Sequence, residues 1–198
     1  MNYWTIGLII FGGILFLYYV YGLLLPRTWE VKESMLIPAE AQQLFDYLNR
    51  MRNWEIWTHW NNESKMGFKF SYDGPESGEG STQKWSAKRG KGETKITGGQ
   101  APDRIDYQFS FGKGKQVMEG KLELAPEGDG VRVDWTVAGQ PSDNPSIKIT
   151  AKMMRPYIAK DLRRGLERLQ GIASSWEGTT AVVDDSPTET SSSDQTEA

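Results

Sequence analysis

The sequence contains no cysteine and only one histidine, His59. The chain therefore has no disulfide, thiolate metal site, iron–sulfur cluster or cysteine nucleophile, and one imidazole excludes a metal site built from several histidines. Neither sign of charge is in large excess, because 23 Lys and Arg face 26 Asp and Glu, for a net charge of −3. This balance does not indicate a general nucleic-acid-binding protein. We expect no metal, no cofactor and no nucleic-acid partner.

Acidic residues gather at the end of the chain. From Glu177 onward there are six acidic residues and no Lys or Arg, which leaves 23 basic and 20 acidic residues in 1–176. This end is rich in Thr, Ser, Asp and Glu and has few side chains to bury. Residues 173–198 are therefore predicted to be a disordered acidic tail.

The N-terminal segment is apolar. Residues 3–25 form a run of 23 residues without a charged side chain. As a helix of about 1.5 Å per residue, this run is about 35 Å long and crosses a hydrocarbon core of about 30 Å. Residues 1–27 are therefore predicted to be a single-pass transmembrane anchor that ends at Pro26. A cleaved signal peptide fits less well, because the run is too long and lacks a basic start and a small-residue cleavage site.

Basic residues near the apolar run predict its orientation. None precedes the run, whereas Arg27 and Lys32 follow it. The positive-inside rule then places the C-terminal domain in the cytoplasm.

Residues 28–172 are predicted to form one α+β domain. Residues 28–37 alternate like a strand, with Glu33 as a polar exception on the apolar face, and two short helical segments follow at 39–49 and 52–60. Six alternating runs separated by Gly- and Pro-rich turns then predict consecutive antiparallel hairpins, at 65–72, 81–88, 93–98, 104–111, 116–124 and 131–138. Residues 145–172 are predicted to be a helix, with Asn144 as its N-cap, Pro145 in its first turn and a kink at Pro156.

Four motifs occur in a characteristic order along this domain. They are Trp54-x-x-Trp57-Thr58-His59-Trp60, Tyr72-Asp73-Gly74-Pro75 followed by Gly78, Gly80 and Trp85, Pro126-x-Gly128-x-Gly130-Val131-Arg132-Val133-Asp134-Trp135, and Asp161-Leu162-x-x-Gly165-Leu166-x-x-Leu169. Together they resemble the motifs of the polyketide cyclase/dehydrase branch of the START-like (SRPBCC) superfamily, from about Thr28 to Gln170. The sequence departs from that pattern at Thr58-His59, where Ser-Pro is usual, and at Gln170, where Lys is usual.

The resemblance implies a helix-grip (START-like) fold, in which a curved antiparallel sheet surrounds a long C-terminal helix. It also implies an apolar ligand site between the sheet and that helix. Twelve side chains are candidates for lining the site, although core packing is the ordinary role for each: Trp57, Trp60, Phe70, Tyr72, Trp85, Tyr107, Phe109, Trp135, Met153, Met154, Ile158 and Leu162.

Catalytic residues do not stand out in the sequence. His59 lies between Trp57 and Trp60 and is a weak candidate for a general acid or base, but a rim histidine satisfied by the backbone is the simpler interpretation. Two carboxylate pairs, Asp103 with Asp106 and Glu119 with Glu123, fit solvated faces. The sequence therefore favours a binding protein over an enzyme.

The predicted C-terminal helix carries an excess of positive charge. Between residues 147 and 172 there are seven basic residues and two acidic ones. A solvated outer face is the ordinary explanation. In a membrane-tethered protein such a face can also rest on anionic headgroups, and the sequence suggests this role for Arg163, Arg164 and Arg168.

The favoured function is binding, sensing or carrying a hydrophobic small molecule or lipid in a membrane-anchored START-like cavity. One alternative is a polyketide cyclase/dehydratase-type enzyme, which requires a polar pair facing the cavity. The other is a protein-interaction module like the chaperone-activator relatives of the superfamily, in which the cavity is filled and the surface carries the function.

Overall fold

The computed structural model describes residues 2–58, 67–88, 90–112, 116–140 and 142–180. The elements in chain order are α1 (Tyr3–Leu24), β1 (Trp29–Ile37), α2 (Ala41–Leu48), α3 (Met51–Trp57), β2 (Lys69–Asp73), β3 (Thr82–Ala87), β4 (Gly90–Gln100), β5 (Arg104–Phe111), β6 (Gln116–Glu127), β7 (Gly130–Gly139) and α4 (Pro145–Thr180). This order confirms the predicted α+β helix-grip fold, with an apolar helix in front of the domain.

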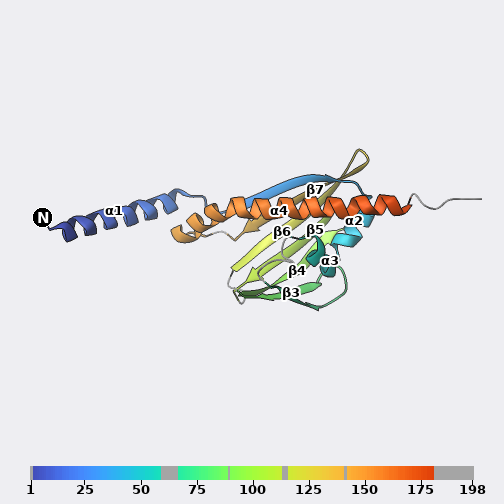
Figure 1. Cartoon of the computed structure of the whole chain (residues 1–198), viewed down its shortest axis with the longest axis horizontal. Coiled ribbons are helices and arrows are strands. Elements are labelled where there is room, and N and C mark those ends of the chain that lie inside the picture. Colours follow the sequence, from blue (N-terminus) through green and yellow to red (C-terminus); the bar gives the residue numbers. More distant parts are fainter. Residues whose placement is uncertain (1, 59–66, 89, 113–115, 141, 181–198) are drawn as a thin grey trace, which may run out of the picture.

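The strands of the described residues form one seven-stranded antiparallel sheet in the order β1-β7-β6-β5-β4-β3-β2. β1 pairs with β7 at one edge, so the first and last strands of the domain lie side by side. The five other pairings join strands that follow each other in sequence, as the predicted hairpins require. The sheet therefore forms a continuous wall along which α4 runs (Figure 1).

One face of this sheet, the inner face, carries Val31, Val133, Trp135, Leu122 and Tyr107. These side chains are buried against apolar residues of α4, including Leu162, Leu166 and Leu169, and against residues of α2 and α3, including Leu44, Trp54 and Trp57. The opposite, outer face carries polar side chains such as Lys32, Arg132 and Asp134. The alternation along each strand therefore predicts correctly which residues enter the core.

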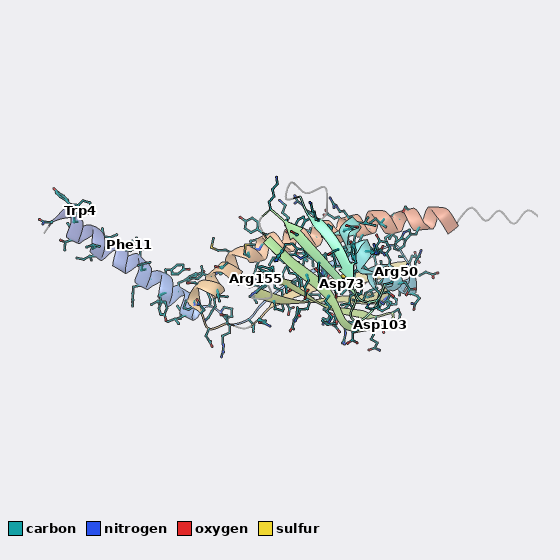
Figure 2. The ribbon with its side chains drawn as sticks, turned by 90° about the horizontal axis from the view of Figure 1, so that it is seen from below. Trp4, Phe11, Arg50, Asp73, Asp103 and Arg155 are labelled. Atoms are coloured by element: carbon teal, nitrogen blue, oxygen red, sulfur yellow. The ribbon has the colours of Figure 1, made fainter. Side chains whose placement is uncertain are left out.

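Helix α4 begins as the sequence predicts and continues further. The Asn144 side-chain oxygen accepts hydrogen bonds from the backbone N–H groups of Ser146 at 2.9 Å and Ile147 at 3.4 Å, which confirms the N-cap. The helix changes direction near Arg155, next to the proline at 156 (Figure 2).

The predicted end of this helix, at residue 172, is too early. α4 continues to Thr180 because its apolar stripe continues: Ala173 is fully buried, and the ring of Trp176 lies 5.1 Å from that of Tyr47. The predicted disordered tail begins at 173, so its first eight residues are helical instead. The remainder of that predicted tail lies outside the described residues.

Two strands extend at least three residues beyond one of their predicted ends. β4 begins at Gly90 and includes residues 90–92, which the sequence predicts to be a turn. Gly92 pairs with Trp85, and its missing side chain makes room for the indole. β6 runs through Pro126 to Glu127, so the hairpin to β7 is tighter than the Gly-rich sequence suggests.

Helix α1 projects away from the sheet (Figure 1). Its side chains are exposed almost throughout, and Gly22 is its one buried residue. Within the described chain, α1 is the one helix long and apolar enough to cross a membrane. Its last turns lie against the start of α4, where a Cβ on Gly22 would be 2.5 Å from the Cβ of Pro145. The domain and the apolar helix are therefore in direct contact.

Candidate functional site

Four aromatic rings fill the inner face beneath the middle of α4. The ring of Trp57 lies 4.7 Å from that of Trp135 and 5.3 Å from that of Trp54, and Trp54 lies 4.7 Å from Tyr107. All four side chains are buried. They come from three elements: α3 supplies Trp54 and Trp57, β5 supplies Tyr107, and β7 supplies Trp135. This group, the ring cluster, leaves little room for a ligand at this level of the fold.

Hydrogen bonds and two glycines hold the ring cluster in place. Trp135 Nε1 donates to the Tyr107 hydroxyl at 2.6 Å, and Trp54 Nε1 donates to the Leu48 carbonyl at 2.7 Å. Gly165 lets α4 approach closely, because a Cβ there would be 2.7 Å from the Trp135 ring. Gly120 lies directly beneath the Tyr107 ring, and its missing side chain provides room for that ring. Burial raises the pKa of Tyr107, which is therefore a neutral hydrogen-bonding group.

A second apolar group occupies the end of the inner face nearer α1. The strand register places Trp29, Gly139, Met118 and Phe109 in one row, because each pairs directly with the next. β1 begins at Trp29, only a few residues after α1, so this row lies toward α1. Phe111 and Trp85 lie in the next row, on either side of Gly92.

These side chains differ from the ring cluster in their burial. Trp29, Trp85, Phe109, Phe111 and Met118 all stay partly exposed. Phe109 and Trp85 stack with their rings 5.7 Å apart and nearly parallel. Six apolar side chains line the inner face and stay partly exposed, and we call them the open apolar row: Trp29, Phe70, Trp85, Phe109, Phe111 and Met118. The inner face is thus closely packed in its middle and partly exposed at the end toward α1.

Polar groups of the described inner face gather around Tyr72. The Gln83 amide donates to the Tyr72 hydroxyl at 3.2 Å, and the guanidinium of Arg52 lies 4.7 Å above the Tyr72 ring. Burial raises the pKa of Tyr72. The indole N–H groups of Trp57 and Trp85 are buried without a hydrogen-bond partner among the described residues. Within the described part of the chain, Trp85 therefore presents a donor without an acceptor in the open apolar row.

The twelve predicted lining residues fall into several environments. Trp57, Tyr107, Trp135 and Leu162 are buried in the core, and Ile158 packs against it partly buried. Phe70, Tyr72, Trp85 and Phe109 are partly exposed on the inner face. Met153 and Met154 are exposed on α4, at 67% and 47%. Trp60 and His59 lie outside the described residues.

The candidate carboxylates that the structure describes belong to the surface. Asp106 forms an ion pair with Arg104 at 3.0 Å, and Glu123 forms one with Lys121 at 2.9 Å. Glu33 is the one carboxylate that the described strands place on the inner face. The described part of the chain has no group of three or more side chains arranged to hold a metal ion.

A pocket that the sequence analysis missed lies where α1 meets the domain. It has a volume of about 160 Å³, and its walls come from residues 25–29, from Gln140 and Ser142, and from the start of α4. Four basic residues line it: Arg27, Lys148, Lys152 and Arg155. Three of them are spaced at i, i+4 and i+7 on α4, which is a pattern of one helix face. This spacing is visible in the sequence, but its proximity to Arg27 is not.

Comparisons with known proteins identify the domain. A sequence profile of the family described as "Polyketide cyclase / dehydrase and lipid transport" matches residues 28–173. The chain belongs to this family. A comparison with curated proteins finds no match.

Solved structures share the fold of this family member at low sequence identity. A protein of Nitrosospira multiformis has a TM-score of 0.55 at 15% identity, covering 76% of this chain and 99% of its own. A protein of Rhodobacter sphaeroides has a TM-score of 0.54 at 13% identity, covering 74% and 93%. The Aha1 dimer of Colwellia psychrerythraea has a TM-score of 0.51 at 15% identity, covering 73% and 96%. At these identities the likeness concerns the fold alone.

Proposed function

We propose that this family member is a membrane-anchored protein that binds an apolar small molecule or lipid on the open apolar row. The observation that carries this proposal is the change in burial along the inner face. The ring cluster is fully buried, whereas the row toward α1 exposes part of six apolar side chains, four of them from strands β2 to β5. Apolar ligand sites are lined in this way, by aromatic and aliphatic side chains on a rigid scaffold.

Membrane anchoring rests on α1. The helix has 22 residues, none of them charged, and exposes nearly all its apolar side chains, which is unfavourable in water. Its length of about 33 Å matches a hydrocarbon core of about 30 Å. Arg27 and Lys32 follow it, so the domain lies on the cytoplasmic side. A ligand that dissolves in the bilayer then reaches the open apolar row over a short path.

The polar atoms near the open apolar row narrow the ligand chemistry. Trp85 Nε1 is a buried donor without a partner among the described residues, and such donors ordinarily have an acceptor. Glu33, the single inner-face carboxylate of the described strands, pairs with Trp135 of the ring cluster, so these strands place no carboxylate in the open apolar row itself. We infer a ligand with a long apolar body and an uncharged acceptor oxygen, such as a ketone, an ester or a protonated acid.

A fluorescence titration of the full chain in detergent micelles with the methyl ester of cis-parinaric acid, an uncharged polyene probe, tests this function. The variant Phe109→Glu places a charge in the middle of the open apolar row. We expect it to weaken probe binding at least about tenfold, because an unpaired carboxylate is costly to bury beside an apolar ligand.

The neighbouring position provides a matched control. Gln108 is the adjacent residue of β5 and points to the outer face, so Gln108→Glu adds the same charge on the same strand but away from the row. Binding should be unchanged in this variant. A wild-type chain that binds no probe, or equal weakening in both variants, would refute the proposed site.

A protein-interaction role is the second candidate, and the ring cluster is the observation that favours it. Four buried rings fill the part of the inner face where a deep ligand cavity would lie. A wild-type chain that binds no apolar probe but associates with another protein through its surface would support this role. We propose no catalytic reaction.

A further inference from the structure

The pocket between α1 and α4 combines positive charge with a position at the end of the apolar helix. Its basic lining residues are Arg27, Lys148, Lys152 and Arg155, and none of its described lining residues is acidic. At about 160 Å³ it is smaller than the roughly 300–1,000 Å³ of sites that enclose a whole drug-sized ligand. Its size suits a headgroup rather than an entire lipid.

The three basic side chains that α4 contributes to the pocket each make hydrogen bonds that use only part of their N–H groups. The Lys148 ammonium is buried and donates to the carbonyls of Leu23 at 3.1 Å and Leu25 at 2.7 Å, so it caps the end of α1. The Lys152 ammonium donates to the Tyr21 hydroxyl at 2.7 Å. The Arg155 guanidinium donates to the Glu30 carbonyl at 2.9 Å. An ammonium has three donors and a guanidinium five, so spare N–H groups remain beside the pocket.

Positive charge is in excess around the pocket. Arg27 forms an ion pair with Asp143 at 2.7 Å, and both side chains are well exposed. The remaining three basic residues are held by neutral oxygens rather than by carboxylates. The N-terminus of α4 adds a partial positive charge, because Ile147 and Lys148 of its first turn line the pocket. An anion therefore finds a favourable potential and ready donors.

We propose that this pocket binds the phosphate of an anionic lipid headgroup. The inference rests on the proposed membrane anchoring, because the last turn of α1 then reaches the headgroup layer and the pocket adjoins that turn. Tyr18, Tyr19 and Tyr21 near the end of α1 are the aromatic residues expected at this interface. The lipid headgroup orients the domain, so that the open apolar row stays close to the bilayer.

The rest of the basic face of α4 lies too far from α1 for this role. Arg163 and Arg164 are about 15 residues beyond Lys148, which is about 22 Å along the helix. Figure 2 shows Arg155 on the half of α4 nearer α1, with Trp4 and Phe11 on the helix beyond. Arg168, further still, donates to the Thr58 carbonyl at 3.2 Å. The headgroup contact that the sequence suggests for these three arginines therefore belongs to the pocket residues instead.

Native mass spectrometry of the full chain with phosphatidylglycerol and phosphatidylcholine in mixed micelles tests the proposal. Wild type should retain phosphatidylglycerol in preference. A basic residue close to an anionic lipid contributes about a fivefold factor, so the double variant Lys152→Gln/Arg155→Gln should lower phosphatidylglycerol affinity about 30-fold. The double variant Arg163→Gln/Arg164→Gln removes the same charge from the same helix and should change it less than about twofold.

Three results would overturn the inference. They are no preference of the wild type for phosphatidylglycerol, equal losses in the two double variants, and full competition by millimolar inorganic phosphate, which would make this a site for soluble phosphate. Alkaline carbonate extraction of membranes is a separate measurement of the proposed anchoring. If the full chain resists extraction while the lipid preference is absent, the headgroup site fails and the anchoring stands; if the chain is extracted, the anchoring itself fails.

Discussion

Replacement of Trp135 by Ala should destabilise the domain strongly. The indole is 1% exposed and packs against Trp57 and Gly165, so its removal leaves a large cavity. Truncation of a buried Trp to Ala costs about 3–5 kcal/mol. The Tyr107 hydroxyl also loses its indole partner inside the core, which adds about 1–3 kcal/mol. Together these two contributions predict a loss of about 4–8 kcal/mol.

The free energy of unfolding is measured by urea denaturation of the full chain in detergent micelles, followed by far-UV circular dichroism. Because the loss is a large part of the about 5–15 kcal/mol that stabilises a typical domain, Trp135→Phe is the companion variant. It keeps an aromatic ring and removes the donor to Tyr107, so it should cost about 1–3 kcal/mol.

Gly165 provides a second, independent check of the same packing. In wild type, Gly165→Ala places a Cβ 2.7 Å from the Trp135 ring, and overpacking of this kind costs about 1–3 kcal/mol. In the Trp135→Phe background the clashing part of the ring is gone, so the gain in helix propensity of about 1 kcal/mol should dominate. A cost below about 1 kcal/mol for Trp135→Ala, or the same effect of Gly165→Ala in both backgrounds, would refute the ring-cluster argument.

Three further changes test other parts of the structure. Asn144→Ala removes the N-cap of α4 and should lower the free energy of urea unfolding by about 1 kcal/mol, whereas Asn144→Ser should largely preserve it. Lys148→Met removes both hydrogen bonds to the end of α1, so limited proteolysis should cleave residues 25–28 faster, and an unchanged rate would contradict the capping role. The pKa of Asp134 is lowered because hydrogen bonds from Lys32 and Ser34 outweigh the effect of burial. A lowered pKa stabilises the fold above the unfolded-state value of about 3.9 and loses that contribution as pH falls, so Asp134→Asn should destabilise at pH 7 and converge on wild type in acid melts.

Much of the fold follows from local patterns in the sequence. The alternation of Ile105, Tyr107, Phe109 and Phe111 predicts β5 and its inward face correctly, because antiparallel strands with one wet side show that period. The cap at Asn144 is equally local. The predicted end of α4 is too early, because Ala173 and Trp176 continue the apolar stripe of the helix. The polar residues between them hide this continuation in the sequence.

The site is less predictable, because burial depends on contacts between distant residues. Trp57 and Trp85 are both tryptophans in family motifs, yet one is sealed in the ring cluster and the other is partly exposed in the open apolar row. The strand register and the close approach of α4 at Gly165 determine which of the two indoles is buried. Similarly, Arg27 and Lys148 are 121 positions apart, and their shared pocket emerges from the docking of α1 on α4.

The most direct test of the proposed function is native mass spectrometry of the full chain purified gently from membranes, with and without Phe109→Glu. We predict that the wild type carries an apolar molecule of defined mass, that the Phe109→Glu chain does not, and that the Gln108→Glu chain keeps it. A wild-type chain free of any such molecule, even after incubation with a total lipid extract, would contradict the account.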